Sequence, residues 1–145
     1  MQHQIDAIVC GVGSGGTITG LSRYFKEVSP QTELVLADPQ GSILHHYVDT
    51  GEVLTTSGSW LVEGIGEDFI PPVSDLSRVK KAYTISDRET MLTGRELLLK
   101  EGILGGASSG TLLAAAIKYC QDQTEKKRVL TFVCDIFVFS RANFS

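Results

Sequence analysis

The feature that most limits the fold of this chain is a glycine-rich segment, residues 11–17, between an apolar run and an amphipathic run. Residues 7–10 are all apolar, which is typical of a short buried strand. From Thr17 onward apolar residues recur at helical spacing until a Ser-Pro pair ends the pattern. A second apolar run follows at 34–37. Strand, helix and strand in so short a span predict a βαβ unit, whose two strands are parallel.

The rest of the chain continues this alternation. Residues 81–85 predict a strand, and the capping-box pattern at 86–89 predicts the start of a helix that ends near Gly102. The run 111–120 is almost entirely small and apolar, so it predicts a helix that is buried on most sides. Residues 129–133 predict one more strand. We therefore expect an α/β fold of three layers, α/β/α, around a mostly parallel sheet.

One long stretch lacks this regularity. Residues 55–67 are polar and glycine-rich, and two prolines at 71 and 72 exclude a helix or a central strand there. We expect a surface excursion, and long excursions in compact domains are often functional. Within it, Trp60 is expected to be a packing residue, and Glu67 with Asp68 is expected to form a solvated turn rather than a catalytic carboxylate pair.

The composition and the charge exclude several classes of protein and of binding partner. The 145 residues fit one domain, and the hydrophobic share of 42% with 21% charged residues excludes a disordered or coiled-coil chain. The formal net charge is −4 and no basic stripe is present, so we expect no nucleic-acid partner. No stretch approaches about eighteen consecutive apolar residues, so we expect no membrane-spanning helix.

The start of the sequence and the cysteines both favour the cytoplasm. The first six residues lack the basic start and the apolar core of a signal peptide. The three cysteines are an odd number without a CxxC spacing, so we expect buried free thiols. His45 and His46 are adjacent and have no third ligand at a suitable spacing, so no metal site is expected.

The first glycine-rich segment has the chemistry of an anion site. Backbone N–H groups at a helix start have no intrahelical partner and carry partial positive charge. Glycines let this backbone approach an anion closely, and the hydroxyls of Ser14 and Thr17 add donors. A phosphate group is the predicted ligand. A P-loop is excluded because Gly16 is followed by threonine and not by lysine.

A nicotinamide dinucleotide remains an alternative at this stage. Gly11, Gly13 and Gly16 satisfy the G-x-G-x-x-G pattern, and Asp38 lies near the end of the next predicted strand, where a ribose-binding acid belongs. These residues alone do not decide against a Rossmann-type NAD-binding module.

A second glycine-rich segment, residues 105–110, opens the buried helix. Its serines either cap that helix or bring a hydroxyl to a ligand. Corners between parallel strands and the helices that follow lie at the carboxyl edge of the sheet. The two segments are therefore expected to converge on one ligand, with a phosphate at one corner and a ring at the other.

Four blocks of sequence now carry a specific resemblance. Together they resemble the second half of pyridoxal-phosphate enzymes of the cysteine synthase and cystathionine beta-synthase family, which has the tryptophan-synthase-beta-like fold. The third block is more similar to cystathionine beta-synthase than to cysteine synthase. The blocks are GVGSGGTITG at 11–20, DPQGSI at 38–43, VEGIGEDFIP at 62–71 and GILGGASSG at 102–110.

The resemblance implies a cofactor and a site. The cofactor is pyridoxal 5′-phosphate, and the implied reaction is the replacement of the β-substituent of serine, or of an activated serine, by homocysteine. A neutral serine hydroxyl facing the pyridine nitrogen suits this chemistry, because it does not stabilise a protonated ring as a carboxylate would. The implied cofactor-binding residues are Gly13, Ser14, Gly15, Gly16, Thr17 and Ser108, and Gly64 and Gly66 are implied on the substrate side.

The catalytic lysine of the family has no counterpart here. In the family this Schiff-base lysine lies upstream of the phosphate loop, and the seven lysines of this sequence lie in helical, strand-edge or charged contexts. We therefore assign no catalytic residue and expect a fragment or truncated isoform without turnover alone. Residues 1–135 would form a partial cofactor-binding domain and 136–145 a divergent tail. The complete enzyme is expected to be a homodimer.

Overall fold

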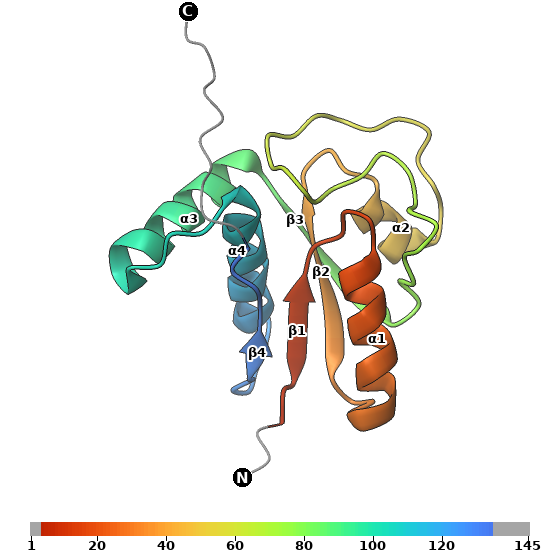
Figure 1. The fold of residues 1–145 in the computed structure, drawn as a ribbon, viewed down its shortest axis with the longest axis horizontal. Coiled ribbons are helices and arrows are strands. Elements are labelled where there is room, and N and C mark those ends of the chain that lie inside the picture. Colours follow the sequence, from red (N-terminus) through yellow and green to blue (C-terminus); the bar gives the residue numbers. More distant parts are fainter. Residues whose placement is uncertain (1–3, 135–145) are drawn as a thin grey trace, which may run out of the picture.

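Four parallel strands form the sheet in the computed structural model, which describes residues 4–134 (Figure 1). The strand order is β3-β2-β1-β4. Each neighbouring pair is parallel, as the βαβ pattern predicted. The strands are β1 (Ala7–Cys10), β2 (Glu33–Pro39), β3 (Val79–Ile85) and β4 (Val129–Leu130).

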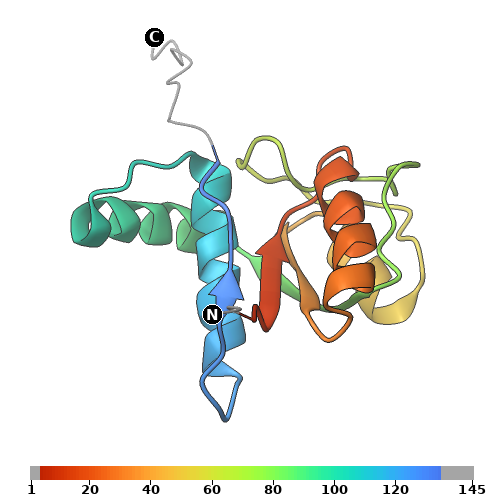
Figure 2. The ribbon, with the colours of Figure 1, turned by 60° about the horizontal axis from the view of Figure 1, so that its bottom comes forward.

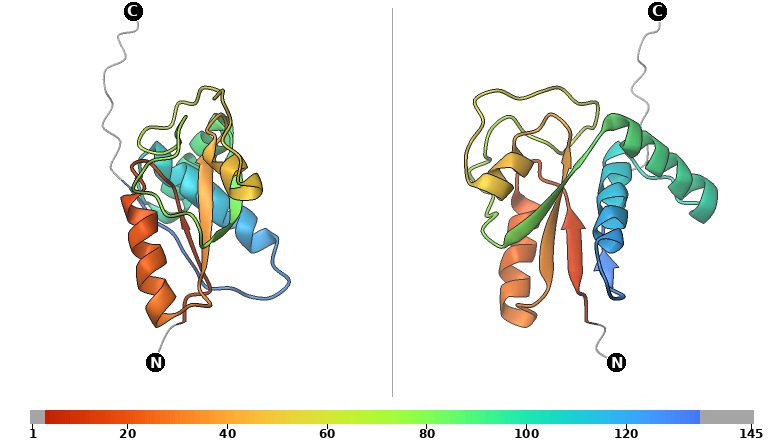
Figure 3. Two further views of the ribbon diagram at one scale, coloured as in Figure 1. Left: turned by 90° about the vertical axis from the view of Figure 1, so that its right-hand side faces the viewer. Right: turned by 180° about the vertical axis from the view of Figure 1, so that it is seen from behind.

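Helices cover both faces of this sheet, which confirms the three-layer α/β/α prediction. The helices are α1 (Gly16–Val28), α2 (Leu44–Thr50), α3 (Asp87–Glu101) and α4 (Ala107–Gln121). Helices α1 and α2 pack on one face and α4 packs on the other (Figure 3). Helix α3 lies outside α4 and packs against it, away from the sheet (Figure 2).

The alternating side chains of β1 supply both halves of the core. Ala7 and Val9 join the cluster under α4, whereas Ile8 and Cys10 join the cluster under α1 and α2. All four are almost completely buried, as expected for a parallel strand that is covered on both faces. This continuous apolar core fixes where the two glycine-rich segments emerge.

The last strand is shorter than the predicted 129–133. Pairing with β1 stops after Leu130, and at the next residue the contact with β1 is made by a side chain, because the hydroxyl of Thr131 donates to the Val9 carbonyl (3.1 Å). The chain then runs beside the start of α4, where the Cys134 carbonyl accepts from Gly106 N (2.9 Å).

Helix α3 starts and ends as its sequence predicted. The Ser86 hydroxyl accepts the Glu89 N–H, and the Glu89 carboxylate accepts the Ser86 N–H, so both halves of the capping box are present. Gly102 ends the helix at φ +70°, a left-handed conformation that favours glycine. The α3–α4 contact is close at Gly110, where an added Cβ would collide with the Thr90 carbonyl.

The segment between α2 and β3 is the predicted excursion. Residues 51–78 contain neither helix nor strand and arch over the carboxyl edge of the sheet (Figure 1). Within residues 4–134, no helix is both long and apolar enough to cross a bilayer. The divergent tail expected at 136–145 lies outside the described residues.

Candidate functional site

The two glycine-rich corners lie at the same end of the sheet. Helix α1 begins directly after Gly15 and α4 directly after Gly106, and both helix starts are at the carboxyl edge toward which the strands point (Figure 1). They approach that edge from opposite faces of the sheet, because α1 and α4 belong to different layers.

The start of α1 leaves its backbone donors free. Its N-cap is Gly15, held in the left-handed region at φ +88°, and no side chain of the described residues caps the helix. Ser14, Gly16 and Thr17 are exposed around this start. Helix α3, by contrast, uses a complete capping box. The first turn of α1 therefore presents unpaired N–H groups and two hydroxyl-bearing side chains to solvent.

The excursion folds directly onto this corner. A Cβ on Gly13 would lie 2.5 Å from the Gly64 carbonyl oxygen, and Gly66 N donates to the Val12 carbonyl (2.9 Å). Gly64 and Gly66 adopt φ of +80° and +87°, conformations that L side chains rarely take. The structure thus brings together Gly13 of the predicted phosphate segment and both glycines predicted on the substrate side.

Ser108 lies at the second corner. It is half-buried in the first turn of α4. The three residues before it, Gly105, Gly106 and Ala107, line a cavity of about 200 Å³ together with residues of α3. No hydrogen bond among the described residues joins Ser108 to the first corner. The alternative in which a serine caps α4 is wrong, because the N-cap is Gly106.

Ser109, to which sequence reasoning gave no separate role, is committed to structure. Its hydroxyl donates to the Cys134 carbonyl and accepts the Cys134 N–H, both at 2.8 Å. Its side chain is 1% exposed, so it ties the start of α4 to the chain beyond β4. Of the two serines in this corner, Ser108 is the one left to meet a ligand.

A second hydroxyl that the sequence did not single out fixes the substrate-side loop. The buried Ser42 Oγ accepts the Glu67 N–H (3.0 Å), and Ile43 N donates to the Glu67 carbonyl (3.0 Å). Ser42 lies in the DPQGSI block, and its position two residues before the start of α2 was the only signal that pointed to it.

Asp38, the residue predicted to bind the ribose in the NAD-binding alternative, is not available to a ligand. Asp38 is fully buried, and its Oδ2 accepts the backbone N–H of His45 (2.9 Å), so the carboxylate holds the first turn of α2. Burial raises the pKa of Asp38 to about 6, although the hydrogen bonds from His45 and Ser42 oppose this effect. The NAD-binding interpretation with Gly11, Gly13, Gly16 and Asp38 is not supported.

The lysines lie away from both corners. None of the seven falls within residues 11–17, 62–67 or 105–110. Three of them pair with carboxylates elsewhere. The pairs are Lys118–Glu89 at 2.7 Å, Lys100–Glu96 at 3.2 Å and Lys81–Asp122 at 3.5 Å.

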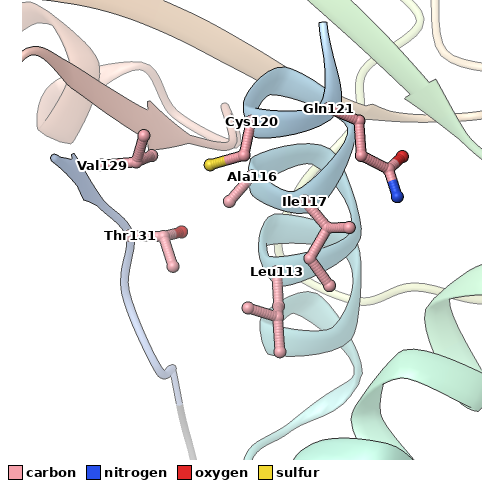
Figure 4. A pocket seen from close by; sticks show the side chains of 7 residues that line it. All are labelled: Leu113, Ala116, Ile117, Cys120, Gln121, Val129 and Thr131. Carbon is pink, nitrogen blue, oxygen red and sulfur yellow. The ribbon is translucent and has the colours of Figure 1, made fainter. Parts of the chain in front are cut away.

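A separate groove lies away from this edge. It measures about 420 Å³ and lies between α4 and β4, lined mainly by apolar side chains such as Leu113 and Ile117 (Figure 4). Cys120 opens onto it and is exposed, so the prediction that all three cysteines are buried is wrong; Cys10 is buried and Cys134 half-buried. Without convergent polar groups this groove lacks the features of a reaction site.

Residues 4–134 hold no cluster suited to a metal ion.

Comparison with known proteins identifies the family. The model of the family described as "Pyridoxal-phosphate dependent enzyme" matches residues 1–135. The chain belongs to this family of enzymes, and its cofactor is pyridoxal phosphate.

Individual relatives carry more particular names. The chain is 42% identical over 134 residues to cystathionine beta-synthase of Apis mellifera, covering 92% of this chain and 26% of that protein. It is 41% identical over 123 residues to cysteine synthase A of Escherichia coli K12, covering 83% and 38%. The O-acetylserine-dependent cystathionine beta-synthase of Helicobacter pylori superposes with a TM-score of 0.79 at 39% identity, covering 91% and 40%. The chain thus spans well under half the length of these relatives.

Proposed function

We propose that this chain forms the cofactor-binding part of a pyridoxal-phosphate-dependent β-replacement enzyme in sulfur amino-acid metabolism. The proposed reaction is of the cystathionine beta-synthase type, in which serine or an activated serine combines with homocysteine. The single observation that carries the proposal is the uncapped start of α1, ringed by exposed Ser14, Gly16 and Thr17 at the carboxyl edge of the sheet. Relatives named cystathionine beta-synthase support the choice of reaction.

The first corner would hold the phosphate of the cofactor. Gly13, Ser14, Gly15, Gly16 and Thr17 surround the free N–H groups of α1, and a helix start of this kind favours a phosphate dianion. The residues present fit that group, because a Cβ built on Gly16 would meet no atom of another segment within 4 Å, so the space beside this position is open.

The second corner would hold the far side of the ring. Ser108 would place its hydroxyl at the pyridine nitrogen, where it accepts or donates a hydrogen bond without adding charge. When bound, the cofactor supplies an electron sink for the reacting carbon of the amino acid. With a neutral partner at the ring nitrogen the cofactor withdraws electrons less strongly than it would beside a carboxylate. This weaker withdrawal suits elimination and replacement at the β-carbon.

The excursion would border the amino-acid substrate. Gly64 lies against Gly13 and Gly66 N donates to the Val12 carbonyl, so a molecule held at the first corner would have this loop beside it. Both positions lack side chains and take left-handed φ values, so the backbone itself would line the substrate side. We propose an amino acid as the small-molecule ligand here.

Covalent attachment of the cofactor requires a lysine, and none of the segments that form the proposed site contains one. Three of the seven lysines are paired with carboxylates of α3 or of the residue after α4, and none belongs to either glycine-rich segment. We therefore propose that the purified 145-residue chain has no β-replacement turnover by itself. Cystathionine formation from serine and homocysteine by this chain alone would overturn that part of the proposal. The homodimeric state of the complete enzyme and its place in the cytoplasm remain predictions.

Calorimetric titration of the chain with pyridoxal 5′-phosphate tests the site. We expect binding that Thr17→Val and Ser108→Ala each weaken by about tenfold, because each removes one hydrogen bond to a charged or ring-nitrogen group. Thr55→Val, an exposed threonine in the excursion, is the matched control and should change nothing. Binding of NADH but not of pyridoxal 5′-phosphate would refute the proposed function.

A further inference from the structure

The loop at residues 62–67 needs something to hold its shape. Its two left-handed glycines, Gly64 and Gly66, lack side chains that could pack, and glycine loses more conformational freedom on ordering than any other residue. The C-terminal end of the loop is nevertheless fixed: Gly66 N donates to the Val12 carbonyl, and the backbone of Glu67 is bound by Ser42. The carbonyl of Ile65, between the glycines, is held from outside the loop.

The group that holds it is the indole of Trp60. Its Nε1–H donates to the Ile65 carbonyl at 3.1 Å. The same ring packs on Gly66, where an added Cβ would lie 2.9 Å from Cε2 of Trp60 and 3.0 Å from Cγ of Pro39. Trp60 is half-buried and comes from the strand-free segment before the loop. One side chain therefore fixes a carbonyl and covers the backbone of the residue after it.

We infer that Trp60 is a positioning residue, whose indole presets the 62–67 loop so that the Gly64 carbonyl abuts Gly13 at the first corner. This inference rests on the proposed function, because it concerns the same site. Without the indole hydrogen bond the loop would sample other shapes, and only the fraction in the binding shape would accept the ring. The phosphate would be less affected, since its donors belong to the start of α1.

The distinction between ring and phosphate gives the test. In Trp60→Phe the ring remains for packing but the donor to Ile65 is lost. We expect its affinity for pyridoxal 5′-phosphate to fall by about three- to tenfold, the loss of one net hydrogen bond. Its affinity for inorganic phosphate should change by less than about twofold, because the free N–H groups at the start of α1 do not depend on the Trp60 hydrogen bond. Both are measured by calorimetric titration.

Phe69→Leu is the matched control, because Phe69 is another aromatic of the same excursion and is 51% exposed. It should leave both affinities unchanged. Trp60 is also the only tryptophan, so its fluorescence in the unmodified chain should be quenched by the nearby cofactor ring but not by inorganic phosphate.

Each outcome decides between positioning and plain packing. An unchanged cofactor affinity in Trp60→Phe, or equal losses for cofactor and phosphate, would overturn the inference. If Trp60→Phe does not fold, Gly66→Ala disturbs the same contact from the other side and should show the same selective loss; without selectivity the inference falls. Failure of the unmodified chain to bind the cofactor would instead refute the proposed function, and the positioning role with it.

Discussion

Gly13→Ala is the substitution that most directly probes how the excursion meets the first glycine-rich corner. The new Cβ would lie 2.5 Å from the Gly64 carbonyl oxygen, whereas real Cβ atoms essentially never approach closer than 3.0 Å. The carbonyl must therefore retreat by about 0.5 Å, and the neighbouring Gly66 N–H to Val12 hydrogen bond moves with it.

The magnitude follows from two opposing effects. Overpacking against a backbone atom costs about 1–3 kcal/mol. The lower entropy of an alanine in the unfolded chain returns about 0.4–1 kcal/mol, because Gly13 is not among the left-handed glycines and alanine can adopt its backbone conformation. We expect Gly13→Ala to lower the free energy of unfolding by about 1–2 kcal/mol.

Urea denaturation followed by circular dichroism measures this change. Gly20→Ala is the matched control, because Gly20 lies inside α1 and an added Cβ there meets nothing within 4 Å. That variant should raise the free energy of unfolding by about 0.5–1 kcal/mol through helix propensity. Equal stability changes in the two variants, or a stable Gly13→Ala chain, would show that the 62–67 loop does not rest on this corner in solution.

Other substitutions test the remaining elements. Ser86→Ala removes the cap of α3 and should cost about 0.5–2 kcal/mol in urea denaturation at pH 7. The hydrogen bond from Lys118 lowers the pKa of Glu89 to about 2, so this pair stabilises the fold above pH 4.5 and its contribution is lost as the pH falls toward 2; Glu89→Gln should flatten stability across that range. Thr90→Val leaves the buried Thr111 hydroxyl without its partner at 2.8 Å and should cost about 1–3 kcal/mol, most of which the double Thr90→Val, Thr111→Val variant recovers. The pKa of Asp38 is raised from 3.8 to about 6, so the folded chain holds more protons than the unfolded chain between these values and its stability falls as pH rises through them; Asp38→Asn should remove that fall from the plot of melting temperature against pH.

Each of these has a result that contradicts it. A Ser86→Ala chain as stable as the unmodified one would mean that the cap is not formed in solution. If Glu89→Gln loses stability at low pH as the unmodified chain does, the Lys118–Glu89 pair does not contribute to stability. A double threonine variant no more stable than the single one would exclude the Thr90–Thr111 hydrogen bond as the cause of the loss. A slope of melting temperature between pH 4 and 6 that survives Asp38→Asn would exclude Asp38 as its source.

Local patterns predicted the elements of this fold because their causes are local. The capping box at Ser86 and the left-handed stop at Gly102 depend only on residues within one helix and its flanks. The βαβ unit was predictable since the apolar run of β1 must be covered on both faces. The end of β4 was not, because beyond Leu130 the chain meets β1 through the Thr131 side chain, which reaches the Val9 carbonyl far away in the sequence.

The features of the candidate site also fall into those that local sequence predicted and those that depend on distant contacts. The uncapped start of α1 followed from its glycines and hydroxyls, whereas the serine cap considered for α4 gave way to Gly106. Asp38 had the right place for a ribose acid, but only the packing of α2 shows that it is buried. Contacts between segments remote in sequence, such as Gly66 with Pro39, have no one-dimensional signature.

Chemical-shift mapping of the ¹⁵N-labelled chain with pyridoxal 5′-phosphate tests the central claim most directly. We predict that one titration shifts the amides of residues 13–17 and of Ser108 with a single dissociation constant. Inorganic phosphate should shift the amides of residues 13–17 alone. Shifts confined to one corner when the whole cofactor is added, or different dissociation constants at the two corners, would contradict the claim that both hold one molecule.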